Sequence, residues 1–432
     1  SARPPSARAF LPKLIPRKQR WMGTNRKIPR PRPTSGGRQT ATGTPPKTPF
    51  LIASSTELVH GIRSVDRSLK ILLPFAAAGL ANLAFAAMCG DCCGRRPRGA
   101  GEAGAAARGG RSRGCAGTAL ALVALAAAVV VAVLEGTAGG VSYVGDGWLH
   151  ECAKWDAEGQ RLLVSNFFGA GVSELRAETA GKGKEKEEER VVLADPDAAG
   201  RVALGLAIDE PRQRLLVVYA DRMPRFGYSA VAAYELASWR RLFLTRLDGP
   251  GDSTLADDVA VDEDGNTYVT DAKGNKIWKV SPDGEPLSVI KNATFFQRPG
   301  WINNFVGLNG IVYHPNGYLL VIHTSGGDLF KVDPKTGSVH VVKVQGSLKT
   351  GDGLALLSPT RLVAAGLVSR LVESNDDWET ATVTGRYVGP AHRIGSAATV
   401  KDGDVYINHI IGFGFGFGKK THVISKAVFA PL

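Results

Sequence analysis

Four residues with oxygen-bearing side chains recur along the second half of the chain, each at the start of a short, largely apolar run. They are Glu151, Asp257, Asn309 and Asp352. Carboxylate and carboxamide oxygens are ligands for hard divalent cations, and Ca2+ takes roughly six to eight of them, with water completing the set. No His or Cys stands at the same position, which disfavours zinc and copper. If the fold brings these side chains together, they predict a site for Ca2+ or another divalent cation.

These residues belong to a unit that occurs six times between residues 141 and 432. Its opening positions are Glu151, Leu204, Asp257, Asn309, Asp352 and Ser396, separated by 53, 53, 52, 43 and 44 residues. Each unit has a short apolar run, a turn containing Asp, Gly or Pro, and a second β-rich run. Units of about 40–50 residues with four short strands each are typical of β-propeller blades. The sequence therefore predicts an all-β, six-bladed β-propeller over residues 141–432.

A propeller places the innermost strands of its blades side by side around a central channel, so residues at one phase of the repeat form a ring. The alternative is that some of these residues are ordinary turn formers, since Asn309-Gly310 and Asp352-Gly353 are common turn dipeptides. Glu151 does not fit that alternative, because Glu is not a turn former. Three anions converging on one axis would repel each other strongly without a cation. We therefore favour the metal site.

The openings of the units resemble those of the senescence marker protein/gluconolactonase family, which includes regucalcin, and in particular its plant calcium-dependent phosphotriesterase-like branch. The matching elements are Glu151 ahead of Trp155-Asp156, Asp257-Asp258 ahead of Val261–Gly265, Asn309-Gly310 and Asp352-Gly353. This resemblance implies a metal-dependent hydrolase of lactones or esters, with the four residues as metal ligands. Two positions depart from the family. Asp257 stands where the lactonases usually have Asn, and Leu255 stands where the sugar-lactone enzymes have a substrate-binding Arg.

In such a hydrolase the cation would polarise a carbonyl or phosphoryl oxygen, and Asp352 would be the catalytic group that takes a proton from the attacking water. Two alternatives remain open at this point. One is a non-catalytic, calcium-stabilised propeller that serves as a binding module. The other is a strictosidine-synthase-like enzyme, for which the chain has no specific motif.

The charge of the chain is unevenly distributed. The net charge is +13, but residues 1–117 hold 21 basic and 4 acidic residues, against 32 basic and 36 acidic residues in the remainder. The basic excess therefore belongs to the leader, and no nucleic-acid partner is predicted for the propeller. We expect a monomeric domain with a small-molecule substrate.

Residues 1–115 are predicted to be a disordered, basic, low-complexity leader of targeting or non-native origin. Residues 116–134 are nineteen uncharged, mostly apolar residues, enough for a helix to span a bilayer of about 30 Å. This segment predicts a signal anchor or a signal peptide, with membrane contact through residues 116–134 if they are not cleaved. The basic flank before it places the propeller on the lumenal or extracellular side, in the secretory pathway or anchored to a membrane. An organelle transit peptide is the alternative.

Overall fold

The computed structural model describes residues 124, 127, 129–131, 140–176, 187–390, 392–414 and 418–432, all of which belong to the compact unit Gly61–Leu432. The predicted leader of residues 1–115 lies outside the described residues, as does most of the apolar segment 116–134. Both therefore stay predictions. Within the described part of the chain, no helix is long and apolar enough to cross a membrane.

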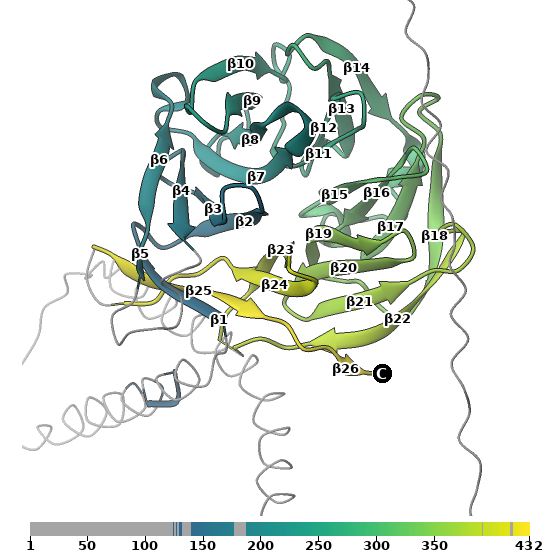
Figure 1. Ribbon diagram of the computed structural model, residues 1–432. Coiled ribbons are helices and arrows are strands. Elements are labelled where there is room, and N and C mark those ends of the chain that lie inside the picture. Colours follow the sequence, from purple (N-terminus) through teal and green to yellow (C-terminus); the bar gives the residue numbers. More distant parts are fainter. Residues whose placement is uncertain are drawn as a thin grey trace, which may run out of the picture. The chain divides into compact units, whose positions relative to one another are not determined.

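From residue 140 onward the chain forms antiparallel sheets that follow one another along the sequence (Figure 1). The first contains β2 (His150–Asp156), β3 (Arg161–Asn166), β4 (Gly171–Arg176) and β6 (Arg190–Ala194). The second contains β7 (Val202–Asp209), β8 (Arg214–Ala220), β9 (Ser229–Glu235) and β10 (Arg241–Arg246). The third contains β11 (Ala256–Val261), β12 (Thr267–Asp271), β13 (Lys276–Val280) and β14 (Pro286–Lys291).

The next strands form a larger, nine-stranded sheet. One part of it is β15 (Leu308–His314), β16 (Tyr318–His323), β17 (Asp328–Val332) and β18 (Val339–Gln345). The other is β19 (Gly351–Ser358), β20 (Arg361–Gly366), β21 (Ser369–Glu373) and β22 (Thr380–Tyr387), with the short β26 (Ala430–Pro431) on β22. The two parts are joined only where β18 and β22 pair in parallel, from Lys343↔Thr380 to Gln345↔Thr382.

The last sheet joins both ends of the described domain. Its order is β23 (Gly395–Lys401), β24 (Asp404–His409), β25 (Lys420–Lys426), β1 (Gly140–Gly145) and β5 (Glu187–Glu188). Strand β1 pairs antiparallel with β25 from Gly140↔Ser425 to Gly145↔Lys420. This pairing joins the first strand of the domain to its last sheet, so the facing edges of β1 and β25 are hydrogen-bonded to each other rather than to solvent.

The first strand of each set lies toward a common centre in Figure 1. These inner strands are β2, β7, β11, β15, β19 and β23. Each contacts its two neighbours in this series, and β23 contacts β2, so the ring is closed. The prediction of an all-β propeller fold is confirmed. The short 3-10 helices lie in the connections: η1 (Pro196–Ala198), η2 (Glu210–Arg212), η3 (Ala293–Phe295) and η4 (Ile302–Asn304).

The apolar runs of the sequence become strands buried on both faces. Every residue of β8 is buried, and its side chains Leu215, Val217 and Tyr219 pack in one cluster with Leu163 and Leu206 of the neighbouring strands. A continuous apolar run is what a doubly buried strand requires. The outer strand β14 is mostly exposed instead. Burial is thus high in the inner and second strands and low in an outer strand such as β14, and the site at the centre lies on well-packed strands.

Candidate metal centre

Each inner strand carries a β-bulge at the position that opens the sequence repeat. In β2 the register passes from His150↔Asn166 to Ala153↔Val164, so Glu151 and Cys152 together face Ser165. The remaining bulges occur at Leu204–Gly205, Asp257–Asp258, Asn309–Gly310, Asp352–Gly353 and Ser396. A bulge bends the strand and redirects its side chains. The repeat phase that the sequence displays is therefore a backbone irregularity shared by all inner strands.

Two glycines of these bulges are required by the closeness of the next inner strand. A Cβ on Gly310 would lie 2.2 Å from the carbonyl oxygen of Asp352, and a Cβ on Gly353 would lie 2.7 Å from that of Ser396. Both dipeptides, Asn309-Gly310 and Asp352-Gly353, lie inside strands β15 and β19. The alternative that they are turn dipeptides is wrong. Glycine is used here because neighbouring backbones nearly touch.

The predicted acidic ligands lie close enough to oppose one another's ionisation. Burial raises the pKa of Glu151 well above its ordinary value, and the charges of Asp352, Asp257 and Asp258 raise it further. The pKa of Asp257 is likewise raised, first by burial and then by Asp352 and Asp258. These carboxyl groups come from the distant strands β2, β11 and β19. The fold has brought these carboxyl groups near one another, and their role as metal ligands stays a prediction.

Asn309 lies between two of these acids. Its Nδ2 donates to Oδ2 of Asp257 at 3.3 Å, and a side-chain hydrogen bond from Asn309 also lowers the pKa of Asp352. The net pKa of Asp352 is nevertheless raised to about 7, because burial in the ring and the charge of Asp258 outweigh this bond. Asp352 is partly exposed as a residue, although Oδ1 of its carboxylate is buried. All four predicted ligands therefore belong to one group.

The hydrogen-bonding of this group fits a hard cation. Oε2 of Glu151 and Oδ1 of Asp352 are buried and have no hydrogen-bond partner within the described structure. Leaving ionised oxygens buried and unpaired is costly, and a divalent cation is the ligand that such oxygens bind. Among the described residues, however, no group of three or more His, Cys, Asp or Glu side chains is placed so that it could hold a metal ion. A cation would have to pull the mutually repelling carboxylates inward.

Sequence reasoning missed residues that hold this group in place. Asp258 accepts hydrogen bonds from the backbone of Val259 at 2.9 Å and of Ile311 at 3.4 Å, so it ties β11 to β15. Asn408 on β24 donates to the carbonyl of Glu151 at 3.1 Å and to Oγ of Ser396 at 3.0 Å. Asp258 is visible beside Asp257 in the sequence. Asn408 gives no signal, because it lies outside the repeat phase.

Lys154 also affects the ionisation of the acids at the inner strands. Lys154 of β2 lowers the pKa of Asp258, which burial still raises on balance, and its Nζ donates to the carbonyl of Ala398 at 3.3 Å.

The thiol of Cys152 is buried and free, and burial raises its pKa to about 12. It is therefore a structural thiol rather than a ligand.

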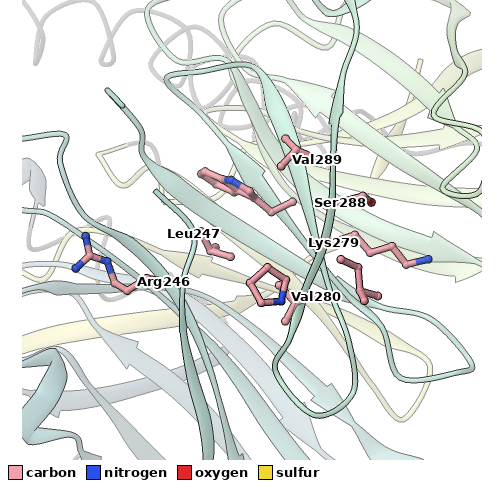
Figure 2. Close-up of a pocket in the computed structure, with 9 residues that line it drawn as sticks. Arg246, Leu247, Lys279, Val280, Ser288 and Val289 are labelled. Atoms are coloured by element: carbon pink, nitrogen blue, oxygen red, sulfur yellow. The ribbon is translucent and has the colours of Figure 1, made fainter. Parts of the chain in front are cut away.

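A surface pocket lies away from these residues (Figure 2). It has a volume of about 280 Å³ and is lined by Arg246, Leu247, Lys279, Val280 and Val289, among others. These come from the outer strands β10, β13 and β14 and from the residue after β10. None of the ring residues lines it, so it is not part of the candidate metal centre.

The similarity of this chain to known proteins lies in its fold. No family model matches the chain, and no curated protein matches it. Among solved structures, the major allergen Mala s 1 of Malassezia sympodialis is similar over 66% of this chain and 96% of its own, with 17% identity and a TM-score of 0.51. A gluconolactonase from Xanthomonas campestris aligns over 65% of this chain and 87% of its own, with 18% identity and a TM-score of 0.41. A virginiamycin B lyase from Staphylococcus aureus aligns over 66% and 99%, with 9% identity and a TM-score of 0.40. At these identities the likeness shows the fold alone.

Proposed function

We propose that residues 141–432 form a six-bladed propeller whose centre is a divalent-cation-dependent hydrolase site for lactones or esters. The blade number follows from the closed series of six inner strands and from dividing the nine-stranded sheet at its short β18–β22 contact. The observation that carries the function is the gathering of Glu151, Asp257, Asn309 and Asp352, with buried carboxylate oxygens that have no partner in the described structure.

Each residue has a role set by its surroundings. Glu151, Asp257, Asn309 and Asp352 would hold Ca2+ or a similar cation through their side-chain oxygens. The bound cation would supply Lewis-acid polarisation of the substrate carbonyl. The carboxylate of Asp352 would accept a proton from the attacking water, since a carboxylate within hydrogen-bond reach of a water can act as its general base. Asn309 fixes the spacing of Asp257 and Asp352 through its amide.

The substrate is expected to differ from the sugar lactones of the family that the sequence resembles. Leu255 is partly buried against Leu204, Val202 and Phe167, so one side of the ring is apolar. An arginine that binds a polyhydroxylated substrate is absent from this position.

The test measures cation binding and catalysis on the same proteins. Calorimetric titration of the full chain with Ca2+ is expected to give saturable binding that Asp352→Asn weakens at least about tenfold, since an anionic ligand is lost. Asp264→Asn, which removes an exposed carboxylate from the β11–β12 turn, is the matched control and should bind as the unmodified protein does.

A panel of lactones and aryl esters, with and without chelator, then tests hydrolysis. Turnover that the chelator abolishes supports the proposal. Cation binding without turnover of any member of the panel would support the calcium-stabilised binding module instead. Identical titrations for the unmodified protein and Asp352→Asn would contradict the proposed metal site.

A further inference from the structure

Large apolar side chains that face solvent gather in the loops at one end of the inner strands. Trp301, Met223 and Phe305 are 75%, 64% and 68% exposed. Phe168 and Trp148 are also exposed. These residues lie in loops that precede an inner strand or connect the second and third strands of a sheet. We call this end of the domain the aromatic face.

Backbone hydrogen bonds between successive loops place them on one face. The amide of Phe167 donates to Leu149 and that of Ala203 to Phe167. Further round the ring, the bonds run from Gly307 to Ala272, from Thr324 to Gly307, from Thr350 to Thr324 and from His150 to Ile410. These contacts run through the loops before β2, β7, β15 and β19, so the aromatic side chains share one side of the domain.

The opposite ends of the strands have a different character. Their turns present exposed carboxylates: Glu158, Glu210, Glu263, Asp264, Asp377 and Asp402. Of the large apolar side chains in these turns, Val428 is the exposed one within the described residues. We call this end the acidic face. The same turns also carry the exposed cations Arg240 and Lys335, so the two ends of the domain differ mainly in their exposed large apolar side chains.

The aromatic face also carries exposed cations. Arg222, Arg225, Lys273, Arg298 and Lys349 all lie in its loops and face solvent. The guanidinium of Arg222 lies 5.7 Å from the ring centre of Phe168, and Nζ of Lys273 lies 5.2 Å from that of Phe226. Of the exposed carboxylates nearby, Asp197 and Asp252 are paired with Arg241 and Lys276, and Asp146 lies beside Trp148 in the loop before β2. Aromatic side chains surrounded by cations match the boundary between anionic lipid headgroups and acyl chains.

We propose that the aromatic face docks the domain onto the surface of an anionic lipid bilayer. Trp301 and Phe305 protrude from the loop between β14 and β15 and Met223 from the loop between β8 and β9; these apolar side chains insert into the interface, while the cations contact headgroups. Charge complementarity selects lipid, since cations near an anionic bilayer surface are attracted to its headgroups. Glu151, Asp257, Asn309 and Asp352 lie at the same end of their inner strands.

This docking is distinct from the membrane contact predicted for residues 116–134. Gly145 lies next to Lys420 and leads directly to Trp148 of the aromatic face, whereas Gly140 lies at the other end of β1. Residues before Gly140 therefore join the domain at its acidic face. A contact through residues 116–134 would not bring the aromatic face to the bilayer, and an experiment can tell the two contacts apart.

Hydrogen–deuterium exchange of the full chain with vesicles tests the proposal. With vesicles that contain phosphatidylserine, residues 296–306 and 221–228 are expected to become protected, while the acidic turns 262–266 and 374–379 stay unchanged. Vesicles of phosphatidylcholine alone should protect the loops much less. Protection of the acidic turns instead, or of neither set, overturns the proposal. Protection of the loops at high protein concentration without lipid means self-association, and also overturns it.

Variants locate the contact. Trp301→Ser with Phe305→Ser is expected to reduce loop protection and vesicle binding at least about tenfold, and Arg222→Glu with Arg225→Glu should do so on anionic vesicles specifically. Leu287→Ser with Val289→Ser is the matched control, because these side chains are 51% and 45% exposed on the outer strand β14. Equal protection in the control and the aromatic-face variants would contradict the proposal.

Discussion

The six bulges of the ring share a backbone geometry but differ in what they present. Four carry Glu151, Asp257, Asn309 and Asp352, whereas the bulge of β7 carries Leu204 and that of β23 carries Ser396. Leu204 is buried in an apolar cluster with Val202 and Ala220, and the hydroxyl of Ser396 donates to the carbonyl of Glu151 at 2.6 Å. The bulge is thus a requirement of the fold, and ligand chemistry is added to it at four positions. Substitutions in one kind of bulge that leave the other kind unchanged test this distinction between ligand-bearing and purely structural bulges.

The largest effect is expected from Asp352→Asn. Loss of the proton-accepting carboxylate should lower hydrolysis by about a thousandfold, within the range for a general base, while the structure is retained because Asn has the same shape. Turnover with and without chelator measures it. Leu204→Met is the control, since Leu204 supplies no ligand and the swap keeps side-chain volume. Equal loss of activity in Asp352→Asn and Leu204→Met would contradict the distinction between bulges that carry ligands and bulges that serve the fold alone.

Removing the cation should make stability depend on pH in an unusual direction. The pKa of Asp352 is about 7 in the folded chain and about 4 in an unfolded one. In chelator, the contribution of Asp352 to the free energy of unfolding is present in full below pH 4 and is lost as the pH rises through 7, by about 4 kcal/mol. Burial and neighbouring charges raise the pKa values of Glu151 and Asp257 too, which adds to the same trend.

Urea unfolding between pH 4.5 and 8 measures this dependence. Asp352→Asn should flatten the slope, because the titrating group is gone. Saturating Ca2+ should oppose the slope in the unmodified protein, since the cation favours the ionised carboxylates. An identical slope in the unmodified protein and in the variant would show that other groups cause the dependence.

Gly310→Ala tests the backbone shared by all six bulges. The added Cβ would meet the carbonyl of Asp352 at 2.2 Å, so the free energy of unfolding should fall by about 2 kcal/mol, a typical cost of overpacking. Thermal or urea unfolding measures it. Gly418→Ala is the control, because nothing lies within 4 Å of a Cβ there. Unchanged stability in Gly310→Ala would mean that neighbouring inner strands can separate without cost.

Ser396→Ala should have the smallest effect. It removes one hydrogen bond to the carbonyl of Glu151, worth about 1 kcal/mol of stability, while Asn408 still donates to that carbonyl at 3.1 Å. Cation affinity should change less than about tenfold in calorimetric titration. Ser238→Ala, in an exposed turn, is the control. A loss as large as that of Asp352→Asn would mean that the uncharged bulges also shape the site.

The repeat makes much of this fold predictable. A unit of four strands requires a third strand after its second β-rich run. In two units this third strand is expected over Lys276–Val280 and Asp328–Val332, and β13 and β17 lie there. The inner strands are predictable because their apolar runs recur at a fixed phase. The extra pairing of β18 with β22 is not predictable in this way, because outer strands are exposed and their pairing leaves no apolar pattern.

The sequence alone determined which residues share a ring position. A propeller converts equal phase into spatial proximity, so the repeat by itself singles out Glu151, Asp257, Asn309 and Asp352. Only the tertiary structure decided that this position is a bulge, that Gly310 and Gly353 serve close backbone approach rather than turns, and that Asn408 anchors the carbonyl of Glu151. These depend on the packing of strands far apart in sequence, whose distances no local pattern records. The same holds for the aromatic face, since loops separated by up to several blades share it only once the ring has closed.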